Sequence, residues 1–370
     1  MGVGVNMEYP VDVDTLQACD DKVIRCLLRS SDGGKTIMNN TLRYLLDKKL
    51  IFHTFANGER HQTSFSIGDD RQVNDKIIES KFKCITDAFD LESNGLFDYF
   101  KAAVSGEGEE VKRINRLTSS SLLAFLCFAT VMARDKKISL EMPPEWYEFA
   151  HLDLHDFSHL DLEYENMLAP GKKSLKNRPS SVDVCLCNDK CVLFLESKFS
   201  EYLLPAKCRT KGVYIDVSAR QYGKRYAEIF DQGPLNPASL QNMWYEDIAA
   251  GKIRLKSNDR FYIGGIKQMI SHWMGIWYEK TTNAEKQKLW EGKDIVLGEV
   301  MFDFGRNGAK DLSTYQAQYK WLAEKLNNLE HGESGITVLP GVLTYQNVFH
   351  SIHLPERVHE YYGLGCAMTV

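Results

Sequence analysis

The chain has 370 residues, of which 44% are hydrophobic and 26% are charged. This composition is ordinary for a globular protein and excludes wholesale disorder, while the length favours two domains, or one large domain with an appendage. No apolar run approaches the roughly 18 residues that a bilayer-spanning helix needs, and the N-terminus lacks the basic and apolar regions of a secretory signal. We therefore expect a cytoplasmic protein whose nine cysteines are reduced thiols.

The net charge of −5 hides a local asymmetry. Between Gly171 and Arg225 there are 12 lysine and arginine residues against 5 aspartate and glutamate residues, a local balance of +7 that leaves −12 for the remainder. A positive surface beside an acidic site suits a phosphodiester substrate. A solvated basic face explains the charge equally well.

Residues 1–70 are expected to form a small module of their own. Asn40 to Leu46 has the apolar spacing of a short helix, and the alternating segments 50–55 and 61–67 flank Asn57-Gly58, a strong hairpin signal. Helices followed by a hairpin resemble a winged-helix module, in which this helix would face a DNA groove and the hairpin would be the wing. A structural cap without DNA contacts is the alternative.

Residues 71–370 are expected to form a second domain, built on a mixed α/β sheet with helices on its faces. Helical patterns come first and alternate with strand patterns afterwards. The expected elements are helices within 69–104 and 111–132, a strand from residue 159, a hairpin at 178–199, helices at 218–230 and 264–278, a central strand at 295–304, a helix at 314–326, and one or two strands within 336–349.

The hairpin carries the main clue to function. Its two apolar runs flank the polar turn Asn188-Asp189-Lys190. Asp183 lies on the first strand, and Glu196 and Lys198 share one face of the second, because strand side chains alternate. Charged groups in apolar strands are costly to bury unless something compensates them, and a divalent cation would do so.

Asp183 and Glu196 are 13 residues apart across the turn, so both carboxylates can reach a common point. Two hard oxygen ligands suit Mg²⁺, which usually takes one or two carboxylates from a protein. Lys198 projects on the same side and can orient, or help to deprotonate, a water that attacks phosphorus. The three residues therefore have distinct expected tasks, as two metal ligands and one water-orienting cation.

Pro179, Asp183 and the triplet Glu196-Ser197-Lys198 resemble the PD-(D/E)xK nuclease superfamily, which has the restriction-endonuclease-like fold. The resemblance covers about residues 105–275. The sequence around the hairpin is also similar to bacterial proteins grouped with restriction-like endonucleases. The resemblance implies a Mg²⁺-dependent DNA endonuclease of restriction, defence or repair type, in which Mn²⁺ can substitute, acting on double-stranded DNA, with a homodimer as one option. Pro179 precedes Asp183 by four residues rather than one, so the "PD" pair is not literal.

Specific roles follow from the resemblance. It implies that Asp183 and Glu196 bind the metal, that the backbone carbonyl of Ser197 is a third ligand, and that Lys198 is the catalytic lysine. A helix glutamate and a polar residue on a following helix often complete such sites. The candidates are Glu110, with Glu163 second, for the acid, and Gln221 or Gln268 for the polar residue.

Plainer interpretations exist for the two candidate acids. Glu110 lies near a helix start, where a carboxylate favours the helix dipole. Glu163 alternates with apolar residues, together with Asp161 and Glu165, on what is expected to be one exposed strand face.

Two other metal centres are disfavoured by the sequence. The spacing of four in His151, His155 and His159 suits a helical metal site, but a strand pattern begins at His159. Cys185, Cys187 and Cys191 lie within the hairpin, where strand geometry would not bring them together with Cys208 around an iron–sulfur cluster. Buried small apolar side chains are the better explanation of these cysteines.

Two rival functions remain open at this point. The first is a catalytically silent nuclease fold that serves as a DNA-binding or assembly module. The second is an unrelated α/β enzyme in which the hairpin carries an ordinary Asp–Lys ion pair. The sequence has no Gly-rich phosphate loop, G-x-S-x-G elbow or H-E-x-x-H motif to support the second.

Overall fold

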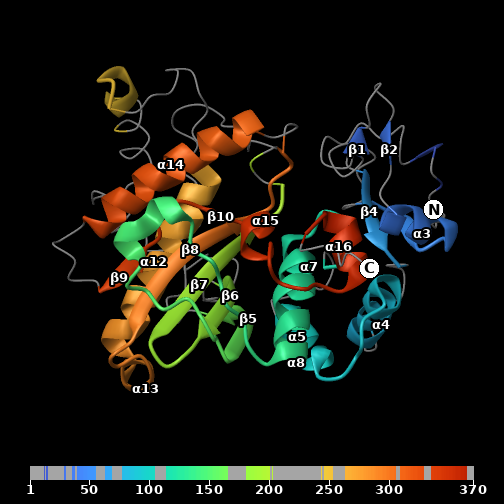
Figure 1. Cartoon of the computed structure of the whole chain (residues 1–370), viewed down its shortest axis with the longest axis horizontal. Coiled ribbons are helices and arrows are strands. Elements are labelled where there is room, and N and C mark those ends of the chain that lie inside the picture. The colour runs from blue at the N-terminus through green and yellow to red at the C-terminus, as the bar shows by residue number, and fades with distance from the viewer. Residues whose placement is uncertain are drawn as a thin grey trace, which may run out of the picture. The chain divides into compact units, whose positions relative to one another are not determined.

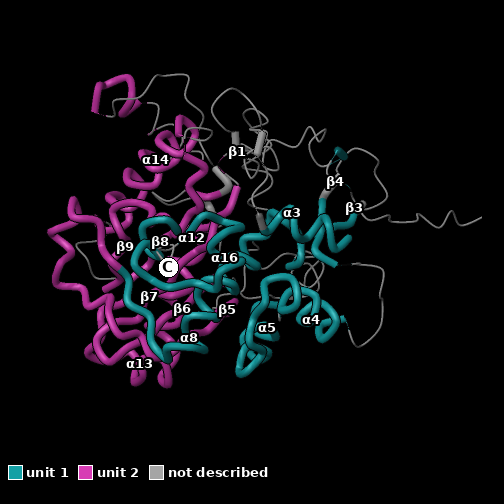
Figure 2. The backbone as a smooth tube through the Cα atoms, turned by 45° about the vertical axis from the view of Figure 1, so that its right-hand side comes forward, with its two compact units in different colours: residues 1–140, 345–370 teal, residues 141–344 magenta. Residues whose placement is uncertain are grey.

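The chain divides into two compact units, Met1–Leu140 with Tyr345–Val370, and Glu141–Thr344 (Figure 2). The boundary expected at residue 70 falls inside the first unit, and a separate module at residues 1–70 stays a prediction. The computed structural model describes residues 12, 14–15, 29–30, 36–37, 40–55, 63–68, 77–104, 114–165, 181–200, 202, 243, 246–252, 263–305, 309–328 and 335–364.

The first unit contains the expected N-terminal hairpin. Strands β3 (Ile51–Phe55) and β4 (Thr63–Ile67) pair antiparallel and follow helix α3 (Asn40–Asp47), which confirms the helix and the hairpin. The other described elements of this unit are β1 (Arg29–Ser30), β2 (Thr36–Ile37), α4 (Ile77–Phe89), α5 (Leu96–Ala103), α7 (Ser120–Ala124), the π-helical η1 (Phe125–Ala129), α8 (Thr130–Asp135), α15 (Tyr345–Val348) and α16 (Glu356–Tyr362).

Helix α3 packs against the C-terminal helix α16. The hydroxyl of Thr41 donates to the backbone carbonyl of Arg357 and to Glu360, both at 3.1 Å. The guanidinium of Arg357 lies 3.9 Å from the centre of the Tyr44 ring, a cation–π contact. One flank of α3 is thus covered within its own unit, and contact of α3 with a DNA groove stays a prediction.

The second unit is built on a six-stranded sheet (Figure 1). The strand order is β10-β8-β7-β6-β5, with β9 also paired to β8. The strands are β5 (His159–Glu165), β6 (Ser181–Cys187), β7 (Cys191–Lys198), β8 (Asp294–Met301), β9 (Ile336–Val338) and β10 (Leu343–Thr344). The β5–β6 and β6–β7 pairs are antiparallel, whereas β8 runs parallel to β7, β9 and β10.

Helices flank this sheet, as Figure 1 shows. They are the 3₁₀ helix η2 (Pro144–Phe149), α12 (Ile263–Thr282), α13 (Ala284–Leu289) and α14 (Ala309–Asn327). Every residue of β7 is buried, which is typical of a strand that is central in a sheet covered on both faces. The mixed α/β fold, the hairpin and the central strand β8 are therefore confirmed, and the arrangement is consistent with a restriction-endonuclease-like fold. The helix expected at residues 218–230 lies outside the described residues.

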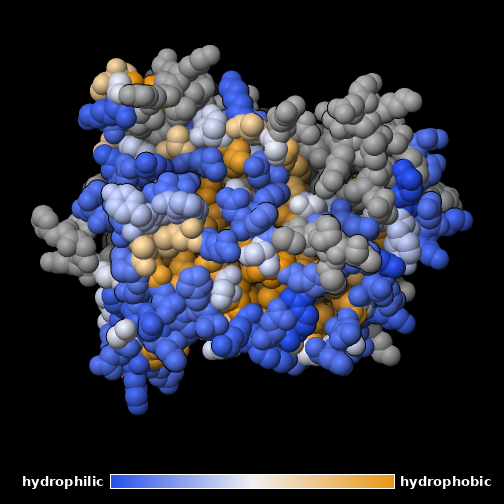
Figure 3. Space-filling view, viewed as in Figure 1, coloured by the Kyte–Doolittle hydropathy of each residue, from blue (hydrophilic) through white to orange (hydrophobic). Residues whose placement is uncertain are grey.

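Hydrophilic residues cover much of the face drawn in Figure 3, with apolar residues showing between them. No helix in the part of the chain that the structure describes is long and apolar enough to span a membrane.

Gly298, in the middle of β8, should tolerate no larger side chain. A Cβ at this position would lie 2.8 Å from Cδ1 of Leu339 and 3.2 Å from Cδ2 of Leu195, which is closer than ordinary van der Waals contact. We expect Gly298→Ala to lower the free energy of unfolding by about 1–2 kcal/mol, and Gly298→Val to lower it further, because overpacking forces neighbours to move. Urea unfolding measures both, and equal stability of wild type and Gly298→Val would contradict the prediction.

Candidate active site

Strands β6 and β7 bring the expected acids together. Val184 is paired with Leu195, so the neighbouring residues Asp183 and Glu196 lie side by side on the opposite face of the hairpin. The backbone amide of Ser197 donates a hydrogen bond of 2.7 Å to Oδ2 of Asp183. The Ser197 carbonyl as a metal ligand stays a prediction.

Glu196 lies at the centre of a buried polar network, with a side chain that is 2% exposed. The ammonium of Lys198 donates to Oε1 of Glu196 and to Oε1 of Gln268, both at 2.6 Å. The side-chain amide of Gln268 also donates to Oε1 of Glu196. Gln268, one of the two candidates for the polar helix residue, thus bridges the expected metal ligand and the expected catalytic lysine.

His272 is a member of this network that sequence reasoning missed as a site residue. Its Nε2 lies 2.9 Å from Oε2 of Glu196, and both side chains are almost fully buried. Gln268 and His272 are four residues apart on α12 and therefore share one helix face. That spacing on a helix following the hairpin was a signal that could have identified His272.

The two hairpin acids differ in their electrostatic state. Burial raises the pKa of Asp183 well above its ordinary value, and the negative charges of Glu196 and Glu163 raise it further. Burial also acts to raise the pKa of Glu196, but Lys198 and His272 outweigh it and lower that pKa to about 2. Glu196 is therefore a compensated anion, whereas a negative charge on Asp183 lacks sufficient compensation.

Glu163 approaches this site from β5. Its φ of 52° is left-handed, which is rare for a residue with a side chain and marks local strain in the strand. Tyr164, the next residue, faces α12, where its hydroxyl donates to Oε2 of Glu279 at 2.8 Å. The pairing of β5 with β6 keeps one register on both sides of Glu163, so a common face for Asp161, Glu163 and Glu165 stays a prediction despite the unusual backbone at Glu163.

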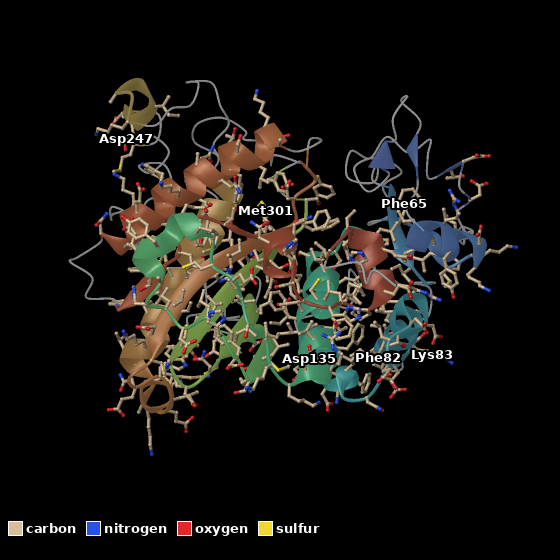
Figure 4. The ribbon with its side chains drawn as sticks, viewed as in Figure 1. Phe65, Phe82, Lys83, Asp135, Asp247 and Met301 are labelled. Atoms are coloured by element: carbon tan, nitrogen blue, oxygen red, sulfur yellow. The ribbon has the colours of Figure 1, made fainter. Side chains whose placement is uncertain are left out.

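Glu163, the second candidate for a third acid, lies within electrostatic range of Asp183. Glu110 and Gln221 lie outside the described residues, so their roles stay predictions. Figure 4 labels Met301, which is paired with Lys198 across β7 and β8 and so marks the end of the sheet where the site lies.

The donor set fits a hard divalent cation. Carboxylates suit Mg²⁺ or Mn²⁺. A cation beside Asp183 would compensate the negative charges of Glu196 and Glu163, which raise the pKa of Asp183. Among the described residues, no group of three or more His, Cys, Asp or Glu side chains is arranged as a metal site. Glu196 instead holds Lys198, so cation binding would require this carboxylate to exchange partners.

Two of the three hairpin cysteines have the burial expected of apolar side chains, whereas Cys187 is half-buried and its sulfur lies 3.2 Å from Nζ of Lys293. Cys185 and Cys191 are buried and carry free thiols, and burial raises the pKa of each. Cys208 lies outside the described residues. His159 begins strand β5, as predicted, and pairs with Asp161 at 3.0 Å.

A family model for restriction endonucleases associating with ARP matches residues 92–289. This span covers more than half of the chain and contains Asp183, Glu196, Lys198, Gln268 and His272. The chain belongs to this restriction-endonuclease family. No curated protein and no solved structure matches the chain. The family supports a nuclease-like protein that interacts with nucleic acid.

His272 offers a test of how the network in this restriction-endonuclease family member supports Glu196. We expect His272→Leu to lower nucleic-acid cleavage by about 10- to 100-fold, because the carboxylate loses the group that holds Oε2. Steady-state cleavage assays measure the change. Thr281→Ala is the control. It removes an exposed hydroxyl on the same helix, which donates to backbone carbonyls of the preceding turn. Equal rates for His272→Leu and Thr281→Ala would contradict the prediction.

Proposed function

We propose that the protein is a Mg²⁺-dependent nuclease that hydrolyses phosphodiester bonds in double-stranded DNA, as an endonuclease of restriction, defence or repair type. The observation that supports the proposal most is the cluster of Asp183, Glu196 and Lys198 at one end of the sheet, in which Glu196 and Lys198 are buried and Asp183 is half-buried. The basic balance of residues 171–225 and the family match add support.

In this proposal Asp183 and Glu196 hold the cation, with the Ser197 carbonyl as a third ligand. When bound, Mg²⁺ polarises a phosphate oxygen and favours deprotonation of water. Lys198 orients the attacking water, while Gln268 and His272 hold Glu196 in place. The water oxygen forms the new bond to phosphorus, the P–O ester bond breaks, and the departing oxygen takes up a proton.

Cleavage of supercoiled plasmid and linear duplex DNA tests the proposal. Full-length protein is incubated with Mg²⁺, with Mn²⁺ or with EDTA, and single-stranded DNA and RNA are run in parallel. We expect cutting of duplex DNA in the presence of either metal and none in EDTA. Absence of cleavage of every substrate with both metals would refute a nuclease.

A non-cleaving nucleic-acid-binding module is the second candidate, and one observation favours it. Glu196 is already engaged by Lys198, Gln268 and His272, with no arranged group of three potential metal ligands among the residues that the structure describes. Calorimetry separates the candidates, because a silent module would bind duplex DNA without binding Mn²⁺.

The family description also names an association with ARP. We therefore propose ARP as the first protein partner to test. Co-purification of the two proteins after co-expression is the expected result, and separate elution of both in size-exclusion chromatography would argue against a stable complex.

A further inference from the structure

Glu299 is a buried carboxyl group next to the proposed active site that has no role in the proposal so far. It lies on β8, is 0% exposed, and is paired in register with Glu196 on the parallel neighbour β7. Registered residues of neighbouring strands point to the same face of a sheet, so Glu299 shares the face of Glu196. Glu299 lies beyond residues 92–289, the span that the family model matches.

Tyr315 links Glu299 to helix α12. Its hydroxyl donates to Oε1 of Glu299 at 2.9 Å from helix α14. The same hydroxyl lies against Gly265 on α12 so closely that any Cβ at this position would overlap it. A side chain at residue 265 would force the Tyr315 ring to move, so the absence of a side chain at Gly265 lets the Tyr315 hydroxyl pack directly against the first part of α12.

Gly265 is in turn connected to the active site by helix geometry. It precedes Gln268 by three residues and His272 by seven, so all three lie on one face of α12. Because a helix is rigid over this length, the distance of Gly265 from the sheet also determines the distances of Gln268 and His272 from the sheet. These are the two helix residues that contact Glu196.

We propose that Glu299 and Tyr315 are a positioning pair that fixes α12 over β7 and so holds Gln268 and His272 against Glu196. The effect of this pair on catalysis rests on the proposed nuclease function. Its effect on Lys198, which donates to Gln268, is independent of that function. Neither residue needs to touch the substrate.

Tyr319 provides a matched control within the same helix. It lies four residues after Tyr315 on α14 and is also buried. Its hydroxyl has no hydrogen-bond partner among the described residues, although burial and the charge of Glu299 both raise its pKa. Tyr315→Phe and Tyr319→Phe thus remove the same atom from the same helix face, but only the first removes the contact with Glu299 and Gly265.

The first measurement is steady-state DNA cleavage with Mg²⁺. We expect Tyr315→Phe to lower kcat by about tenfold or more with KM unchanged, because displacement of a site by about 1 Å costs up to roughly 100-fold. Tyr319→Phe should keep the wild-type kcat. Equal kcat values for the two variants would overturn the proposal, as would a Tyr315→Phe effect confined to KM.

The second measurement is independent of nuclease activity. Limited acetylation with acetic anhydride, read by peptide mass spectrometry, reports how accessible the buried Lys198 is relative to Lys190, whose side chain is 74% exposed. We expect the acetylation ratio of Lys198 to Lys190 to rise about fivefold in Tyr315→Phe, because local opening exposes Lys198, and to stay at the wild-type value in Tyr319→Phe. An unchanged ratio in Tyr315→Phe would refute the positioning role.

Conservative substitution of the acid completes the test. Glu299→Gln keeps an oxygen that can accept from Tyr315, whereas Glu299→Leu removes it. The proposal requires the acetylation ratio of Glu299→Gln to remain near wild type and that of Glu299→Leu to match Tyr315→Phe. If wild type cuts no nucleic acid, the proposed function fails, yet the acetylation ratios still decide whether the pair positions α12.

Discussion

Asp183→Asn should abolish cleavage, lowering kcat by at least about 1,000-fold, and at the same time stabilise the metal-free protein. Activity is lost because a proposed metal ligand is replaced by a neutral amide. Stability rises because the aspartate is half-buried beside Glu196 and Glu163, and desolvation and these two negative charges make its own charge unfavourable. Cleavage assays and thermal unfolding in EDTA measure the two effects.

The pH dependence of stability tests the same residue. The pKa of Asp183 is raised above its ordinary value of 3.8, so the folded state holds the proton more tightly and stability falls as the pH rises from that value to the folded pKa. Glu196, with its pKa lowered to about 2 from 4.5, contributes stability that is complete above pH 4.5. Wild type should therefore lose stability as the pH rises above 4.5, where the contribution of Glu196 is already constant, and Asp183→Asn should not show this loss.

Divalent cations should reverse the order of stability. Mn²⁺ at about 100 times its dissociation constant stabilises a protein by about 2.7 kcal/mol, so the wild-type Tm should rise by several degrees while that of Asp183→Asn stays constant. Asp153→Asn is the control, since Asp153 pairs with Lys190 at the hairpin turn and lies outside the site. An equal Mn²⁺ response in wild type and Asp183→Asn would rule out Asp183 as a ligand.

Lys198→Met should likewise abolish cleavage, by about 1,000-fold or more, but with the opposite effect on stability. The lysine is 6% exposed and its ammonium compensates the buried Glu196, so its removal should cost about 3 kcal/mol in the free energy of unfolding. Mn²⁺ binding should be retained, because both proposed carboxylate ligands remain. Cleavage assays, urea unfolding and calorimetry measure the three quantities.

The matched control for this lysine is Lys252→Met. Lys252 is 70% exposed and pairs with Asp247, so its replacement should leave cleavage and stability nearly unchanged. Cleavage by Lys198→Met within tenfold of wild type would remove Lys198 from the mechanism. Loss of Mn²⁺ binding in Lys198→Met would instead indicate that the network around Glu196 had collapsed.

The hairpin and its cluster of charged side chains could be predicted from the sequence because every signal is local. Alternating side chains and a polar turn fix the pairing of β6 with β7, and this pairing alone brings Asp183 to Glu196. Gln268 was proposed as one of two options, because nothing in the sequence shows which helix covers the strand. The structure brings Gln268 to Lys198 and Glu196 at hydrogen-bond distance.

Three features depend on tertiary packing, and of these only His272 had a signal in the sequence, its spacing of four from Gln268. Glu299 looks like an ordinary residue of an apolar strand until the register of β7 with β8 places it beside Glu196, and His272 reaches Glu196 only through the packing of helix α12. The left-handed backbone of Glu163 has no sequence signature, since glutamate rarely adopts it. The metal, the substrate and the oligomeric state are likewise set by contacts that a single sequence does not encode in its local pattern.

The first compact unit combines residues 1–140 with residues 345–370, while the unit that carries the proposed site is continuous. A ribosome therefore releases all of residues 141–344 before helix α16 can dock on α3. Until then, the partners of Thr41 and Tyr44 on α16 are absent, and that flank of α3 is open to chaperones or proteases. The unit that begins first in synthesis is thus the one that is completed last.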